Sequence, residues 1–114
     1  MHTINRAILI VKPRTPYLDW VNGLNQSEKP VTYDELITEQ SVFLIPEVDE
    51  GELELHVRRH FKTIFENELE GWSLDHGDWP QKRTFKLFKE WFQLEWGSEV
   101  YDLGRGEIER ESKE

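Results

Sequence analysis

Two histidines and a glutamate in the segment ELELHVRRH (52–60) have side chains that bind metal ions. Glu52, His56 and His60 recur every four residues, so they line one side of a helix, and imidazoles one turn apart are common zinc ligands. Together they would span about 12 Å of helix axis, which is too far for one ion to contact all three. We therefore expect no bound metal and no cofactor, with His56 and His60 as weak candidates for ligands.

The segment DHGD (75–78) places a histidine beside two carboxylates. His76, flanked by Asp75 and Asp78, could act as a general base. The same residues are typical of a glycine turn in which aspartates accept hydrogen bonds from backbone N–H groups. The chain has no cysteine, which excludes thiolate catalysis and disulfides. A metal-dependent or histidine-based enzyme is therefore an alternative function and not the favoured one.

Two tryptophans flank this loop, and a basic stretch follows it. Trp72 and Trp79 stand at the two ends of WSLDHGDWP (72–80), outside any long apolar pattern. Tryptophan is enriched at interaction hot spots, although it also commonly closes the end of a core. We expect Trp79→Ala to weaken association more than folding. The predicted interaction surface comprises Trp72, Asp75, Asp78, Trp79, Lys82, Arg83 and Lys86.

Charge sets further bounds on function. The 114 residues include 23 acidic and 14 basic side chains, a formal net charge of −9, whereas nucleic-acid-binding proteins usually present a basic surface. The stretch KRTFKLFK (82–89) is nevertheless basic and free of acids, while EVDEGELE (47–54) is acidic. The charge thus disfavours nucleic acid as a partner, and a weak contact through a basic helix 82–89 is a third alternative. The expected partner is another protein or a second copy of the chain, as in a homodimer.

The pattern of apolar residues predicts the elements that carry these groups. The segment 6–11, which is continuously apolar from Ala7, indicates a strand covered on both faces, placed centrally in a sheet. Pro13 should end it, and Thr15 before Pro16 should cap a short helix. A capping box at Thr32 begins another brief helix, about 33–39, before a second buried strand at 41–46.

The second half of the chain is dominated by one long helix. Apolar residues recur at helical spacing over 49–70, with Asp49 as the expected cap and Gly71 as the expected stop. A last helix, capped by Thr84 or Asp78, precedes an alternating strand at 94–100. Only one apolar residue follows Gly104, which is typical of a flexible tail.

These elements have the order β-α-α-β-α-α-β. They predict an α+β fold, or a small α/β fold, with a three-stranded sheet and about four helices. We expect one globular domain, residues 1–104, followed by a tail at 105–114. The first apolar run is too short for a secretory signal or a membrane span, so we expect a cytoplasmic protein with no membrane partner.

Three segments, KPRTPYLDWVNGL (12–24), VFLIPEVD (42–49) and WPQKRTFKLFKEWFQLE (79–95), resemble a group of small bacterial proteins. The shared features are a Pro-x-x-Pro-aromatic-Leu-Asp-Trp helix start and a late helix that begins after Trp-Pro. The resemblance implies a bacterial, cytosolic single domain, and it transfers no activity and no catalytic residue. The absence of a catalytic signature, the uneven charge and the loop tryptophans favour a small acidic, non-catalytic module for protein interaction or regulation.

Overall fold

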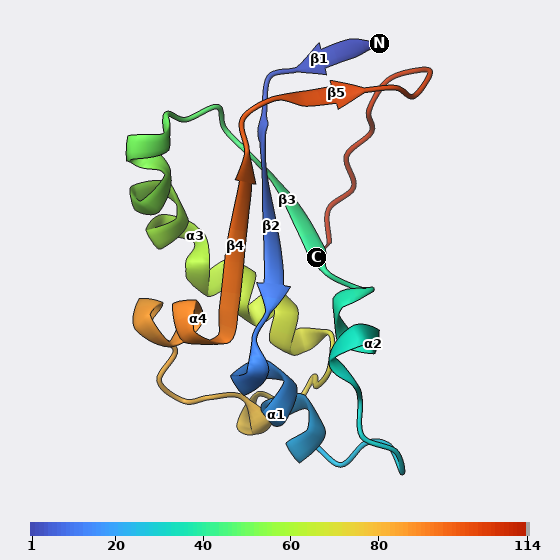
Figure 1. The fold of residues 1–114 in the computed structure, drawn as a ribbon, viewed down its shortest axis with the longest axis vertical. Helices are drawn as coiled ribbons and strands as arrows, with labels where there is room; N and C mark the ends of the chain where they lie inside the picture. The colour runs from blue at the N-terminus through green and yellow to red at the C-terminus, as the bar shows by residue number, and fades with distance from the viewer. Residues whose placement is uncertain (114) are drawn as a thin grey trace.

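A seven-residue strand, β2 (Ala7–Pro13), occupies the centre of a three-stranded antiparallel sheet. In the computed structural model, which describes residues 1–113, the sheet has the order β3-β2-β4. The outer strands are β3 (Ser41–Ile45) and β4 (Phe92–Gly97). The prediction of a three-stranded sheet with the first apolar strand at its centre is confirmed (Figure 1).

Only one face of this sheet is fully covered. Side chains alternate along β2, so that Ala7, Leu9 and Val11 are buried while the residues between them are half-buried. The expectation that the strand is covered on both faces was wrong. Helix α3 (Glu50–Glu70) crosses behind β4 and β2 in Figure 1, and its buried residues share one core with the inward residues of β2. The opposite face is open enough to leave apolar side chains accessible.

Two short strands at the ends of the chain form a second sheet that the sequence analysis did not predict. Strand β1 (His2–Ile4) pairs antiparallel with β5 (Val100–Asp102), and the pair lies beyond the end of the main sheet (Figure 1). Each strand is three residues long, too short for an alternating pattern to stand out. The fold is therefore α+β with two sheets and, within residues 1–113, four α-helices.

The first two helices follow different capping rules. Helix α1 (Thr15–Gly23) begins one residue earlier than predicted, because Arg14 occupies the cap position and Thr15 is already helical. No side chain caps this helix, so the prediction for Thr15 was wrong. Helix α2 (Tyr33–Ile37) begins as predicted, with the Thr32 hydroxyl accepting a hydrogen bond from the Glu35 N–H at 3.2 Å.

The long helix α3 is confirmed and provides most of the helical core. Its buried residues recur at helical spacing along one side. Asp49 stands at the cap position as predicted, but its side chain caps nothing. Gly71 is the C-cap, as expected. The buried residues of α3 are Val57, Phe61, Ile64, Phe65 and Leu69.

Helix α4 (Phe85–Trp91) runs directly into β4. The Thr84 hydroxyl accepts a hydrogen bond from the Leu87 N–H at 3.1 Å, so Thr84 is the cap. The predicted basic helix 82–89 is therefore wrong at its start, because its first three residues precede α4. At the junction, the Phe88 and Phe92 rings both pack within 6 Å of Phe65.

Beyond β5 the chain is extended and exposed. Residues 104–113 contain no helix or strand, and in Figure 1 they run back from β5 toward the start of β3. Residue 114, the last of the predicted tail, lies outside the described residues. No helix within residues 1–113 combines the length and the apolar character needed to cross a membrane.

Candidate functional site

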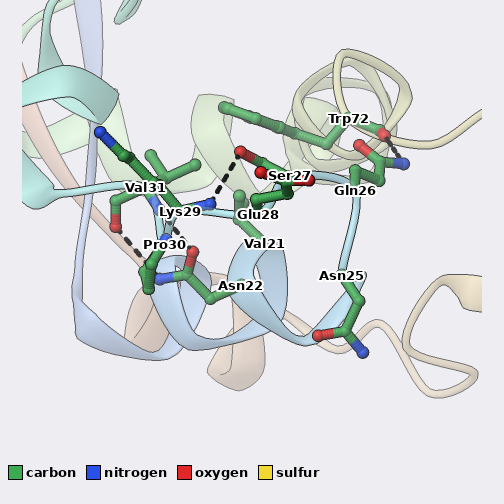
Figure 2. A pocket seen from close by; sticks show the side chains of 10 residues that line it. All are labelled: Val21, Asn22, Asn25, Gln26, Ser27, Glu28, Lys29, Pro30, Val31 and Trp72. Carbon is green, nitrogen blue, oxygen red and sulfur yellow. Dashed lines mark hydrogen bonds between the residues drawn. The ribbon is translucent and has the colours of Figure 1, made fainter.

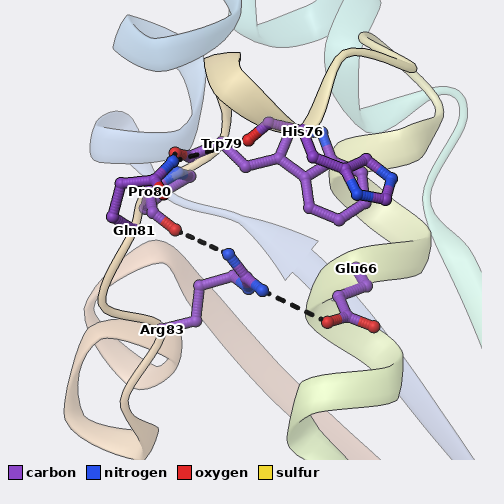
Figure 3. A network of polar contacts seen from close by, with 6 residues as sticks. All are labelled: Glu66, His76, Trp79, Pro80, Gln81 and Arg83. Atoms are coloured by element: carbon purple, nitrogen blue, oxygen red, sulfur yellow. Dashed lines mark hydrogen bonds and ion pairs between the residues drawn. The ribbon is translucent and has the colours of Figure 1, made fainter.

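Trp79, the central residue of the predicted interaction surface, is buried, with 6% of its surface exposed. Its indole N–H donates to the Ser73 carbonyl at 3.0 Å, and the His76 ring stacks on it with centroids 4.0 Å apart. The Arg83 guanidinium lies 5.5 Å from the indole ring (Figure 3). Trp79 therefore closes the end of the core, one of the two roles that its sequence allowed, and is not an accessible anchor for a partner.

The two aspartates of this loop hold a turn. Asp75 accepts a hydrogen bond from the Gly77 N–H at 2.9 Å, and the Asp78 carboxylate accepts one from the Ser73 hydroxyl at 2.8 Å. These bonds shape the short helix η1 (His76–Asp78). Within residues 1–113, no hydrogen bond joins the His76 ring to either carboxylate. The turn interpretation is confirmed, and this arrangement gives no support to a general base.

Ion pairs neutralise part of the basic stretch. Arg83 pairs with Glu66 of α3 at 3.3 Å (Figure 3), and Lys89 pairs with Glu54 at 3.6 Å. Both contacts direct positive charge toward α3, so the basic surface is smaller than the sequence suggests. The bases of this stretch that are exposed and make no ion pair within residues 1–113 are Lys82 and Lys86.

Trp72, the other tryptophan of the loop, is half-buried and lines a hollow of about 180 Å³ with both polar and apolar walls (Figure 2). The loop that follows α1 forms the hollow's other wall. The Gln26 amide fixes this loop to Trp72 by donating to its carbonyl at 2.7 Å. Asn22 both donates to and accepts from the backbone of Val31. Trp72 is therefore partly accessible, unlike Trp79.

The two histidines weakly favoured as metal ligands do lie together. The rings of His56 and His60 are 4.8 Å apart on α3. The pKa of His56 is lowered, first by partial burial and then by the charges of His60 and Arg59. No group of three metal-binding side chains gathers anywhere in residues 1–113. The pair thus has no third ligand within the described chain.

The feature that the sequence analysis missed is the free edge of β3 with a hollow beside it. We call this the β3 hollow; it has a volume of about 170 Å³ and lies between β3 and α3. Because β3 is an edge strand, its outer backbone groups pair with no strand of residues 1–113. Its outward side chains, Val42 and Leu44, are 53% and 52% exposed. Residues lining the β3 hollow include Phe43, Leu44, His56, His60 and Ile64.

A larger apolar hollow, about 420 Å³, lies between α3, α4 and β4. We call it the α3–α4 hollow. Its floor is apolar, and charged groups of both signs surround it, among them Arg14, Glu50 and Lys89. The Trp96 indole nitrogen in its wall is buried and has no hydrogen-bond partner within residues 1–113. An apolar molecule with one acceptor atom would fit this chemistry.

Comparison of the chain with protein-family models, with curated proteins and with solved structures finds no match. The site is therefore defined by geometry and chemistry alone.

Proposed function

We propose that this protein is a non-catalytic interaction module that binds an extended segment of another protein along strand β3. The free edge of β3 supports the proposal. Edge strands are usually protected by charged residues or proline within the strand, whereas Ser41–Ile45 contains neither. An added strand gains main-chain hydrogen bonds from such an edge, and pockets for its alternate side chains give specificity.

The β3 hollow supplies such a pocket. In a paired strand, successive side chains point to opposite faces of the sheet. One set from the bound segment would enter the hollow between β3 and α3, where His56 and His60 line the wall. The other set would extend the open aliphatic face, on which Leu44 lies opposite Ile8 and Val42 opposite Ile10.

Charge favours a basic segment over a second copy of this chain. Acidic residues stand on both sides of β3, with Glu39 before it and Glu47 and Asp49 after it. Two copies paired symmetrically about Phe43 would place Glu39 of each opposite Glu47 of the other, and like charges directly opposite are destabilising. A segment with alternating aliphatic residues and flanking lysines or arginines is complementary.

A displayed library of random peptides tests this function. Selected peptides should alternate aliphatic residues between basic ends, should bind the wild type, and should lose binding to Leu44→Lys. The matched control is Leu74→Lys, which changes another exposed leucine, 78% accessible, in the Trp72–Trp79 loop. Amide chemical shifts should change along β3. No selected binder, or binders that Leu44→Lys retains, would reject the proposal, and dimerisation through β3 would replace it with self-association.

The α3–α4 hollow supports a second candidate function, the binding of a small apolar molecule. Its volume falls within the range of small-molecule sites, and such sites combine an apolar lining with a few polar groups. Anilinonaphthalene sulfonate is a suitable fluorescent probe. Its binding should disappear in Leu53→Trp, which fills the hollow, and persist in Leu55→Trp, a change at an exposed position of the same helix.

A further inference from the structure

A third cavity, separate from both hollows, contains a buried carboxylate. It has a volume of about 220 Å³ and lies where α1, the end of α3 and the start of β3 meet the tail. We call it the Glu68 cavity. Residues lining it include Tyr17, Gln40, Ser41, Glu68, Trp72 and Lys113.

The Glu68 carboxylate is incompletely satisfied. Its Oε1 atom is fully buried and accepts no hydrogen bond within residues 1–113. The Tyr17 hydroxyl does not satisfy it, because that hydroxyl donates to the backbone carbonyl of Glu68 at 2.8 Å. Burial raises the pKa of the Glu68 carboxyl, while its interaction with Ser41 lowers it. A buried acceptor without a donor is costly, so this oxygen favours an incoming donor, and a cation most strongly.

The chain already brings one ammonium group to this cavity. Lys113 of the exposed tail lines it and donates a hydrogen bond to the Asn67 side chain. Its charge also lowers the pKa of the neighbouring Glu68 carboxyl. The ammonium nevertheless leaves Oε1 without a partner. The tail thus holds a cation beside the carboxylate without occupying the cavity.

We propose that the Glu68 cavity binds the primary ammonium group of an aliphatic amine, with Glu68 as its counter-ion and Lys113 as an internal competitor. The ligand's alkyl portion would lie against Val11, Leu36 and Phe92, the apolar residues of a lining that is otherwise largely polar. The ammonium group would belong either to a free amine or to a lysine side chain of another polypeptide. The site is independent of the β3 proposal, since Ser41 is the only β3 residue in its lining.

Calorimetric titration of the full chain with n-butylamine tests the proposal. Binding to Lys113→Met should be several-fold tighter than to the wild type, because the competing cation is gone. Lys82→Met, the matched control, removes an exposed lysine elsewhere and should bind like the wild type. The neutral analogue n-butanol should not bind. Equal affinity of Lys113→Met and the wild type, or equal binding of butanol, would overturn the proposal.

Adding Glu68→Gln to Lys113→Met should abolish butylamine binding, and retained binding would also overturn the proposal. Because this change could disturb packing, a second measurement follows binding to Lys113→Met alone as the pH is lowered. Affinity should fall as Glu68 becomes protonated, while the amine stays charged; affinity that did not change with pH would exclude Glu68 as the counter-ion.

Blocked lysine, Nα-acetyl-lysine N-methylamide, distinguishes the two sources of the ammonium group. If it also binds, the cavity admits a polypeptide's lysine, and if only butylamine binds, the ligand is a free amine.

Discussion

The Tyr17 hydroxyl donates a 2.8 Å hydrogen bond to the backbone carbonyl of Glu68, which joins α1 to the last turns of α3. Tyr17 is buried, and its ring packs 4.7 Å from that of Phe92 at the start of β4. Burial, and after it the negative charge of Glu68, raises the pKa of this phenol, so the hydroxyl stays a donor at every pH at which the protein would be handled. One tyrosine therefore connects two helices and the sheet.

Replacing Glu68 with glutamine should change how stability depends on pH. Burial raises the pKa of this carboxyl in the folded state, so the unfolded chain loses its proton first as the pH rises. The free energy of unfolding therefore decreases with rising pH until the folded-state pKa is passed. Glu68→Gln removes this loss, so the variant should match the wild type near pH 3 and exceed it at pH 7. The expected gain is about 1.4 kcal/mol for each unit by which the pKa is raised. Thermal melts from pH 3 to 7 measure it, and a variant less stable than the wild type at pH 7 would contradict it.

Alanine at position 79 should weaken folding and leave association unchanged. Trp79 is buried and its indole N–H bonds to Ser73, so we expect Trp79→Ala to cost about 3–5 kcal/mol. This is the opposite of what the loop's sequence suggested. Urea melts compared with sedimentation check both quantities. Lys82→Ala, at an exposed neighbour, should stay within about 0.5 kcal/mol of the wild type.

A side chain at position 97 would require the Ile8 side chain to move. A Cβ atom at position 97 would lie 2.6 Å from the Ile8 Cγ2 atom. Gly97→Ala should therefore cost about 1–3 kcal/mol, and much less in an Ile8→Ala background. The control is Gly51→Ala in α3, where an added Cβ meets nothing within 4 Å and where alanine should stabilise the helix by about 0.5–1 kcal/mol. If the cost of Gly97→Ala is the same in both backgrounds, steric conflict is not its cause.

Replacing Phe61 should destabilise the fold far more than replacing Asp49, the cap residue of the same helix. Phe61 is buried and packs against Phe85 and Phe88 with ring centroids 5.3 and 5.9 Å away. Phe61→Ala should cost about 3–5 kcal/mol. Asp49→Ala should cost less than the usual ~1 kcal/mol of a cap, because the Asp49 side chain makes no capping bond. Urea denaturation ranks the two, and a larger loss for Asp49→Ala would mean that the helix begins elsewhere.

Removal of the tail after Gly104 should leave the fold intact. Residues 105–113 are exposed, and Ile108, their one aliphatic side chain, is 57% accessible. The melting temperature of the truncated chain should stay within a few degrees of that of the full chain. A loss of cooperative unfolding after truncation would show that the tail supports the core.

The sequence predicted the main sheet well, because long apolar runs carry a strong signal. The position of β2 at the centre followed from its uniform apolar character. The same uniform apolar character led to the wrong prediction that both faces of β2 are covered. An aliphatic residue such as Ile10 can lie on a covered or an open face of a sheet, and here it is half-exposed. Caps were correct at Thr32 and Thr84 and wrong at Thr15, while Asp49 holds the predicted cap position but makes no capping bond. A cap depends on which rotamer the tertiary structure leaves open, and sequence spacing does not carry that information.

The candidate sites were harder to predict than the elements. The Glu68 cavity combines residues from α1, β3, α3 and the tail, and nothing local marks Glu68 among so many acids on the chain. The free edge of β3 follows from strand order, which the sequence left undetermined for the outer strands. The two tryptophans led to the prediction of an interaction surface at the Trp72–Trp79 loop, although tryptophan is common both in cores and at interfaces.

The central position of β2 also affects how the protein is made. β2 is synthesised well before its partner β4: Lys12 of β2 and Glu95 of β4, whose side chains form an ion pair, are 83 positions apart. At 5–20 residues per second, the ribosome needs roughly 4–17 s to cover that distance. Throughout that time the most apolar strand of the nascent chain has an unpaired edge, and its non-local pairing is of the kind that slows folding. Newly made chains should therefore depend on chaperones until β4 has been synthesised.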